Sequence, residues 1–378
     1  MKAFKKICLY LSVIIFVMLV NTALFAQEKE IKAIQFSDGS VVQGKVIEMN
    51  AEIIKVKTKT GKTVIRLFDD IVSVEDYVDK KKTAEGKASF SKTSYIQATP
   101  KLFTEFGLKT KYIHGDATYH ISFPGGASEL EFPYDNFMAG ITLAVGSKYT
   151  EKPKQIKGLL NLSLLYSPTM DSGTFKDSDW TGSVKTHYTE SDAESNGIIF
   201  DVNYAYHFSL NNNWTLGPMV GYKYMDFNFD IYGARGTYPS GPVSISGKVL
   251  EYDIHCQLPY IGLSSNLLFG REDQFQLNFI FGYSPWAKVK DRDDHILRYK
   301  LSEGDCDGHA YLVDINIDWN FYSNWTLGLG AEYVDIDTSG KQHQSFYAGP
   351  YAGWTADIDD EITSSYWSAM LRISYAFF

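Results

Sequence analysis

Two short segments of the chain carry side chains whose types and spacing suit hydrolysis. The first is KVKDRDDH, residues 288–295, which contains Asp291, Asp293, Asp294 and His295. Asp293 and His295 are two positions apart, so on an extended chain their side chains lie on the same side. A carboxylate beside an imidazole orients the ring and raises its basicity, as a general base near neutral pH requires. This pair therefore predicts a base that takes a proton from water.

The second segment, DSDW at residues 177–180, adds a pair of acids. Asp177 and Asp179 are also two positions apart. Carboxylates held close together do not both ionise easily and tend to share a proton, and such a pair can hold a water or a developing tetrahedral intermediate. If the two segments meet, they predict peptide hydrolysis by activated water, with no covalent intermediate and no metal. Two plainer interpretations stay open: an acidic loop with Asp-x-Asp by chance, or a calcium site of hard oxygen ligands.

The beginning of the chain predicts export. Three lysines precede an apolar stretch at residues 7–20, and small residues at 23–26 place cleavage after Ala26. The apolar stretch, about 14 residues, is too short to span a bilayer as a helix. Residues 1–26 are therefore predicted to be a signal peptide. After export only Cys256 and Cys306 remain, and the sequence allows either one disulfide or two unpaired thiols.

Composition points to a membrane barrel. Aromatic residues make up 15% of the chain, with 26 Tyr and 24 Phe, yet the mean hydropathy is −0.20. Aromatic girdles on an otherwise polar chain are typical of outer-membrane barrels. The net charge of −9 argues against nucleic acid as a partner.

From residue 101 onward the polarity of the chain alternates over long stretches. In residues 313–321, for example, the odd positions are apolar and the even positions are Asp or Asn. Membrane-spanning strands need about 9–11 residues, and in lipid only a closed sheet leaves no unpaired edge. The sequence thus predicts an all-β protein with a ten-stranded antiparallel transmembrane β-barrel at residues 101–378. The ten strands are expected at 102–114, 128–147, 157–168, 197–208, 213–229, 250–269, 274–289, 309–321, 324–337 and 366–378.

The expected connections alternate between short turns and long loops. Bacterial barrels place short turns in the periplasm and long loops outside, and an even strand number puts both ends of the barrel in the periplasm. Both acidic segments then belong to long loops at the same extracellular rim. The short connections lie near 148–156, 209–212, 270–273 and 322–323, and the long ones near 169–196, 230–249, 290–308 and 338–365.

The segment before the barrel has a different pattern. In residues 27–78, short β-branched runs alternate with turn signals such as Asp38-Gly39 and Thr60-Gly61. This predicts a small SH3-like or Sm-like β domain on the periplasmic side. Residues 79–100 are polar without periodicity and are expected to be a linker.

The barrel region resembles the omptins, the outer-membrane endopeptidases of Gram-negative bacteria. The resemblance is carried by DSDW (177–180), NYAYHFSL (203–210), MVGYKY (219–224), LPYIGLSSNLLF (258–269), YSPWAKVKDRDDH (283–295) and the C-terminal strand. It implies that Asp177 and Asp179 are the family's aspartate pair and that Asp293 and His295 are its catalytic dyad. It also places Asp291 in the pocket for the basic residue before the cleaved bond, because omptins cut between two basic residues.

Two departures from the family pattern change the expected specificity. The first strand lacks the glutamate that faces the basic residue in omptins, and Asp116 is out of register, so a weaker basic preference is expected. Of the basic residues that bind lipopolysaccharide in omptins, Arg235 is matched, whereas His255 stands where an arginine would be. Dependence on lipopolysaccharide is therefore expected to be reduced.

The resemblance implies an aspartic-type endopeptidase that needs no cofactor, acts as a monomer in outer-membrane lipid and cuts extracellular peptides or proteins. The main alternative is a non-catalytic porin or adhesin that retains omptin-like loops. A lipid A-modifying enzyme is a minor alternative, because the rim offers no Ser-His pair.

Overall fold

The computed structural model describes residues 31–36, 40–49, 53–58, 62–67, 71–76, 102–149, 155–322 and 324–377. The chain divides into two compact units, with the boundary between Gln97 and Ala98. The predicted signal peptide, the predicted linker and the terminal Phe378 lie outside the described residues. Within the described residues, no helix is long and apolar enough to cross a membrane.

The smaller unit contains an antiparallel five-stranded sheet in the order β4-β3-β2-β1-β5. Ile34, Phe36, Ile54 and Val56 pack together as its core. Short β-branched strands were expected in this segment, and the SH3-like or Sm-like classification stays a prediction. The strands are β1 (Ile31–Phe36), β2 (Val41–Met49), β3 (Ile53–Thr58), β4 (Thr63–Leu67) and β5 (Ile71–Asp76).

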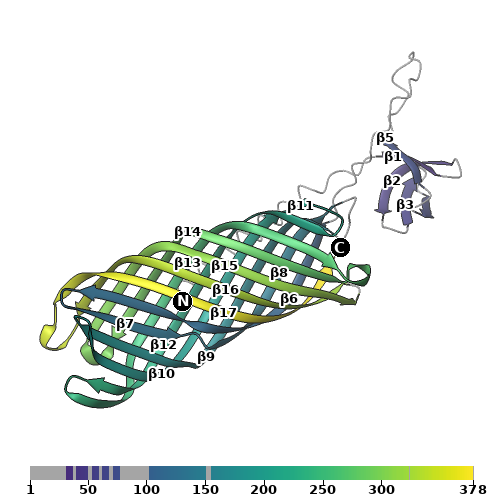
Figure 1. Cartoon of the computed structure of the whole chain (residues 1–378). Helices are drawn as coiled ribbons and strands as arrows, with labels where there is room; N and C mark the ends of the chain where they lie inside the picture. Colours follow the sequence, from purple (N-terminus) through teal and green to yellow (C-terminus); the bar gives the residue numbers. More distant parts are fainter. Residues whose placement is uncertain are drawn as a thin grey trace. The chain divides into compact units, whose positions relative to one another are not determined.

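The larger unit is a closed antiparallel β-barrel (Figure 1). β17 pairs with β6 and thereby closes the ring. β7 and β8 follow one another along β6 and β9, so the described strands occupy ten positions around the barrel, as predicted. The strands are β6 (Leu102–Phe123), β7 (Gly126–Pro133), β8 (Asn136–Lys148), β9 (Ile156–Thr181), β10 (Val184–Tyr206), β11 (Phe208–Ser209), β12 (Trp214–Tyr238), β13 (Gly241–Phe269), β14 (Phe275–His295), β15 (Lys300–Tyr322), β16 (Trp325–Phe346) and β17 (Thr355–Phe377).

The apolar face of the strands points out of the barrel. In β15, Tyr311, Ile315 and Trp319 are 41%, 45% and 42% exposed, whereas Asp314 and Asp318 line the cavity inside the barrel. A soluble sandwich would bury this apolar face instead. The outward apolar surface fits a barrel surrounded by lipid.

The two kinds of connection alternate between the ends of the barrel as predicted, but the predicted length of the long loops is wrong. One end of the barrel carries the ends of β8, β10, β13 and β15, with the short β11 after β10, and the other carries the tips at 124–125, 182–183, 239–240, 296–299 and 347–354. Nearly all of the expected loop residues 169–196, 230–249, 290–308 and 338–365 belong to continuous strands. The two acidic segments therefore lie on strands rather than on loops.

The composition of the strand ends explains this error. In residues 187–195 of β10 the buried positions are His187, Thr189, Ser191, Ala193 and Ser195, and the residues between them are largely polar or acidic. Away from lipid, the outer face needs no apolar side chains and the inner face needs only small ones. The alternation of polarity therefore disappears while the ladder of backbone hydrogen bonds continues.

An aromatic layer fills the barrel below the rim. Phe132 of β7 stacks on Tyr252 of β13 with ring centroids 3.8 Å apart, and Phe229 of β12 packs on both rings. Tyr134 contacts Phe227, Phe229 and Tyr366. These aromatic side chains come from several strands around the barrel. They therefore form a packed layer across the lumen beneath the rim.

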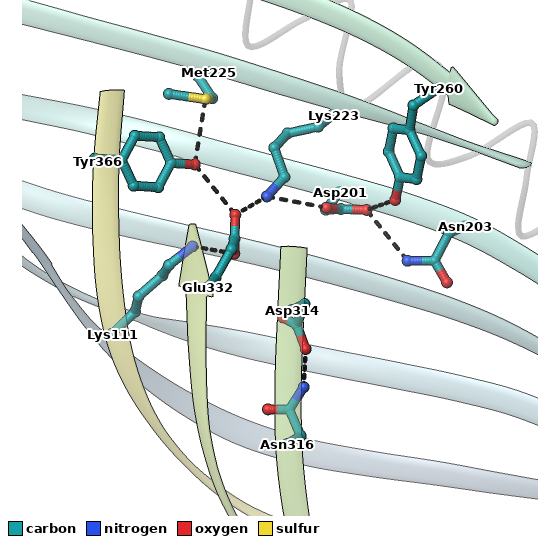
Figure 2. A network of polar contacts seen from close by, with 10 residues as sticks. All are labelled: Lys111, Asp201, Asn203, Lys223, Met225, Tyr260, Asp314, Asn316, Glu332 and Tyr366. Atoms are coloured by element: carbon teal, nitrogen blue, oxygen red, sulfur yellow. Dashed lines mark hydrogen bonds and ion pairs between the residues drawn. The ribbon is translucent and has the colours of Figure 1, made fainter. Parts of the chain in front are cut away.

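A network of charged side chains crosses the barrel beneath this layer (Figure 2). Glu332 of β16 accepts hydrogen bonds from Lys111 of β6, at 2.5 Å, and from Lys223 of β12. The Tyr366 hydroxyl also donates to Glu332, at 3.2 Å. Lys223 lies 3.4 Å from Asp201. Since β12 and β16 stand on facing walls, the Lys223–Glu332 pair bridges the lumen directly.

A polar cavity of about 570 Å³ extends from this network to the short connections. Asparagine and aspartate side chains, including Asp314, Asn316 and Asp318, line it together with Arg372. Arg372 bridges Asp318 and Glu105 at 2.8 and 3.2 Å. The lower half of the barrel is thus polar inside but separated from the rim.

Strand register shows whether Cys256 and Cys306 can form a disulfide. Cys256 and Cys306 are both free and buried, and each pairs with Val289 from opposite sides. Their Cα atoms are thus two strand spacings apart, roughly 9–10 Å. A disulfide requires Cα atoms within about 7 Å. The disulfide alternative therefore does not apply.

Candidate functional site

The predicted catalytic residues lie on two facing walls of the rim. β14 presents Asp291, Asp293 and His295 inward at alternate positions near its end. β9 presents Asp177 and Asp179, and three strand positions, β10, β12 and β13, separate it from β14 around the ring. The charges of His295 and Asp293 act on Asp177, so the closed barrel brings the two segments into one site.

Asp293 and His295 form a buried pair. His295 Nε2 lies 2.8 Å from Asp293 Oδ2, and Asp293 has no exposed side-chain surface. The Tyr119 hydroxyl donates a longer hydrogen bond of 3.4 Å to the same carboxylate oxygen. Because Asp293 engages Nε2, Nδ1 is the ring nitrogen left to exchange a proton with a substrate or water.

The electrostatics of this pair favour a neutral imidazole beside an ionised carboxylate. Burial lowers the pKa of His295 below its ordinary value, and this effect outweighs the attraction of Asp293. For Asp293, burial alone would raise the pKa, but the charge and hydrogen bond of His295 bring it below the ordinary value. A neutral imidazole held by a carboxylate is the state that a general base needs.

The two acids of β9 enclose a histidine that the sequence did not single out. His187 of β10 lies 3.6 Å from Asp177 through Nε2 and 3.6 Å from Asp179 through Nδ1. Burial, followed by repulsion from Asp179, raises the pKa of Asp177 to about 6. Asp177 therefore keeps its proton to a higher pH than an ordinary aspartate does. One ligand atom from each of the three residues lies within 4.8 Å of the others, which is also the geometry of a possible cation site.

Two basic residues at the rim were also missed. Lys300, 8% exposed, opens β15 directly opposite His295, and its charge lowers the pKa of His295. The charges of Asp177 and Asp179 raise the pKa of Arg298, against the effect of burial. The sequence signal was available, since both residues follow His295 within five positions. Their inward direction, however, depends on the turn at Ile296–Arg298.

Asp291 lies deeper than the dyad. It is 5% exposed, and the nearby acid is Asp360 of β17, which is 3% exposed. Asp116 faces out of the barrel, whereas Ala117 next to it and Tyr119 further along the strand face inward. The first strand therefore offers no inward acid among residues 113–121, in line with the missing glutamate.

The predicted lipid-contacting residues lie on the outer wall. Arg235 is exposed on β12, opposite Ser244 of β13. His255 faces outward on β13, and its Nδ1 lies 3.1 Å from Asp226 Oδ1. A carboxylate thus accompanies the histidine that stands in the position of an arginine.

Comparison with known proteins gives this barrel a family. The model of the omptin family matches residues 153–346, just over half of the 378 residues. The plasminogen activator of Yersinia pestis is 28% identical over 177 residues, which cover 43% of this chain and 54% of that protein. The outer membrane protease OmpP of Escherichia coli K12 is 32% identical over 142 residues, which cover 33% and 44%. The chain thus spans about half the length of the curated relatives it matches.

The barrel also resembles a solved structure. The crystal structure of the outer membrane protease OmpT from Escherichia coli aligns with a TM-score of 0.62 at 15% identity, covering 73% of this chain and 97% of that one. The shared architecture is therefore a closed barrel of the outer-membrane protease type. The chain belongs to the omptin family.

Proposed function

We propose that this protein is an outer-membrane endopeptidase that hydrolyses peptide bonds at the extracellular rim of its barrel. The observation that carries the proposal is the meeting of two segments from facing walls. The 2.8 Å His295–Asp293 pair lies close enough to Asp177 to influence its titration, and Asp177 shares its site with Asp179. A base and a pair of acids on opposite sides of a gap are the components of water-mediated hydrolysis.

In this mechanism His295 accepts a proton from the attacking water through Nδ1, while Asp293 holds the ring through Nε2. As the imidazolium forms, the buried carboxylate of Asp293 stabilises the new positive charge. On the facing wall, Asp177 and Asp179 orient the water and supply a proton to the tetrahedral intermediate. The raised pKa of Asp177, about 6, makes that proton available near neutral pH.

The acid limb of this activity should depend on Lys300. Its positive charge opposes protonation of His295 and so lowers the histidine pKa. In Lys300→Met the pKa of His295 should rise. Because the neutral imidazole is the active form, activity should then be lost at a higher pH on the acid side. The measurement is kcat/KM against pH. Lys341→Met, at a rim position 69% exposed, should leave the profile in place, and an unmoved acid limb in Lys300→Met would contradict this account.

The interior of the barrel argues against a porin. A diffusion channel needs an open lumen, whereas Lys111, Lys223 and Glu332 bridge this one and the aromatic layer closes it above them. An adhesin remains compatible with the outer surface. However, it would have no need for a buried Asp293–His295 pair or for a second pair of acids directed at it.

A metal-assisted hydrolase is the second candidate, because Asp177, Asp179 and His187 could together hold a cation. Aspartate and histidine are suitable zinc ligands. Against this arrangement, the positive charge of Arg298 acts on both aspartates. We therefore favour a role for His187 in holding the acid pair.

The substrates we propose are peptides with a basic residue before the cleaved bond, because the buried carboxylate of Asp291 lies beneath the dyad. Arg235 on the outer wall supports binding of a lipopolysaccharide phosphate. We also propose that the barrel is monomeric in outer-membrane lipid. Its rim would then lie outside the cell and the N-terminal unit in the periplasm.

The proposal predicts that intact cells carrying the protein cleave an added peptide library, with products that begin after Arg or Lys. Peptides too large to diffuse through the outer membrane should be cut as well, since the rim faces outward. Purified barrel should show the same specificity in detergent, with more activity when lipopolysaccharide is added, and EDTA should leave the rate unchanged. Activity abolished by EDTA and restored by zinc would favour the metal-assisted hydrolase. No cleavage by folded barrel with lipopolysaccharide would reject the proposed function.

A further inference from the structure

Asp291 and Asp360 form a carboxylate pair that has no counter-ion. Neither residue belongs to an ion pair among the described residues, and no basic group is among the main influences on either pKa. Both oxygens of Asp291 and Oδ1 of Asp360 lack a hydrogen-bond partner of normal length. Buried carboxylates usually have partners, so this exception requires an explanation.

The glycine at position 304 leaves room for the two carboxylates of this pair. Asp291 of β14 is paired with Gly304 of β15, the strand on the side toward β17. A Cβ atom on Gly304 would lie 2.1 Å from Asp291 Oδ1 and 2.6 Å from Asp360 Oδ2. Any side chain at residue 304 would therefore collide with both carboxylates. The same distances place the acids within the range of about 4–6 Å in which like charges disfavour each other's ionisation.

The surroundings of the pair are polar and closed. Ser302, fully buried one inward position above Gly304, has an unpartnered hydroxyl. Cys306 lies one inward position below, and its Sγ is 3.7 Å from Asp360 Oδ2. The buried hydroxyl of Tyr252 on the neighbouring wall has no hydrogen bond of normal length, and the acid on which it acts as a donor is Asp291. The unsatisfied groups thus gather around one point beneath the dyad, and most of them can accept a hydrogen bond from a cation.

We propose that Asp360 is a specificity-determining residue which, with Asp291, forms a slot for the cationic side chain of the substrate. This inference rests on the proposed function. β17 would thereby supply the second acid that the first strand lacks, from a position beyond the residues 153–346 that match the family. Two carboxylates can take a guanidinium or ammonium group through charge-assisted hydrogen bonds. The preference for Arg or Lys is then as strong as that of a two-acid pocket.

Before a cationic side chain binds, this carboxylate pair holds a proton that the substrate must displace. Burial, followed by the charge of Asp360, raises the pKa of Asp291 well above its ordinary value, and burial raises that of Asp360 to about 7. A bound cation favours both ionised forms, so a proton leaves for solvent as the basic side chain enters. The preference for basic over neutral substrates should therefore increase as the pH rises through 7.

The test compares two peptides that differ only in arginine or citrulline before the cleaved bond, since citrulline keeps the shape and loses the charge. Asp360→Asn should reduce the arginine-to-citrulline ratio of kcat/KM by about ten- to a hundredfold. Asp359→Asn is the matched control, because this neighbouring side chain is 76% exposed and pairs with Lys341. The control should leave the ratio unchanged. Equal losses on both peptides in Asp360→Asn would overturn the inference.

A binding measurement separates this inference from the proposed function. In a His295→Ala background, calorimetry should show tighter binding of the arginine peptide than of the citrulline peptide, and proton release in buffers of different ionisation enthalpy. Adding Asp360→Asn should reduce both effects. If the barrel binds the arginine peptide in this way but wild type cleaves nothing, the slot stands and the protease proposal fails. If wild type cleaves both peptides equally well, the slot is wrong and the protease proposal stands.

Gly304→Ala provides a second variant in case Asp360→Asn fails to fold. The added methyl group should block the slot, because it would meet both carboxylates. Arginine peptides should then lose their advantage while peptides with a small residue at that position keep theirs. A Gly304→Ala barrel that still prefers arginine would contradict the slot.

Discussion

His295→Ala should reduce cleavage by about 10²–10⁴-fold, which is the contribution that a general base typically makes. This corresponds to about 3–5 kcal/mol of transition-state stabilisation. The loss should appear mainly in kcat, since in the proposed mechanism the imidazole acts on the water rather than on substrate binding. Asp293→Asn should cause a loss of the same order, because an amide cannot stabilise the imidazolium that forms at His295.

His343→Ala is the matched control for this experiment. His343 also lies near the rim, on β16, but it faces outward and is 51% exposed beside Asp357. Its removal should leave cleavage within the error of the assay. Both variants should run as folded barrels in unheated electrophoresis, which excludes misfolding as the cause. If His295→Ala remains active, His295 is not the base.

The second large effect concerns stability. Glu332→Gln should lower the free energy of unfolding by about 3–5 kcal/mol, the usual cost of removing one partner from a buried ionic network. Lys111 and Lys223, 1% and 3% exposed, would then face each other with no carboxylate between them. Urea unfolding of the barrel in detergent, followed by tryptophan fluorescence, measures this change. Glu361→Gln, on the exposed face of β17, should cost little.

A triple replacement tests whether the stability of the barrel depends on the charges of this network or on the space that its side chains fill. Lys111→Met, Lys223→Met and Glu332→Leu together remove both lysines and the carboxylate between them while keeping apolar volume in the lumen. Asp201, which loses its 3.4 Å contact with Lys223, keeps the hydrogen bond from the Tyr260 hydroxyl. Apolar replacements of complete buried networks are often neutral or stabilising, so this variant should be more stable than Glu332→Gln. If the triple variant is the less stable of the two, the network stabilises the barrel in some way other than charge compensation.

The sequence by itself determined the strands that face lipid and their number. Alternation of apolar and polar side chains is a local property, and lipid imposes it wherever a strand crosses the membrane. That Asp293 lies beside His295, and Asp177 near Asp179, was also readable from the sequence. Spacing of two on an extended chain places Asp293 with His295, and Asp177 with Asp179, whatever the rest of the fold does.

Only the tertiary structure decided which residues from distant strands meet. Above the membrane the outer face becomes polar, so the continuation of β9, β10, β14 and β15 toward the rim leaves no hydrophobic period in the sequence. The position of Asp360 beside Asp291 depends on Gly304 and on closure of the ring between β17 and β6. In the same way, the register of three strands, rather than any property of the cysteines, keeps Cys256 and Cys306 apart. Contacts across a barrel are set by ring closure and register, which are properties of the whole sheet rather than of any one segment.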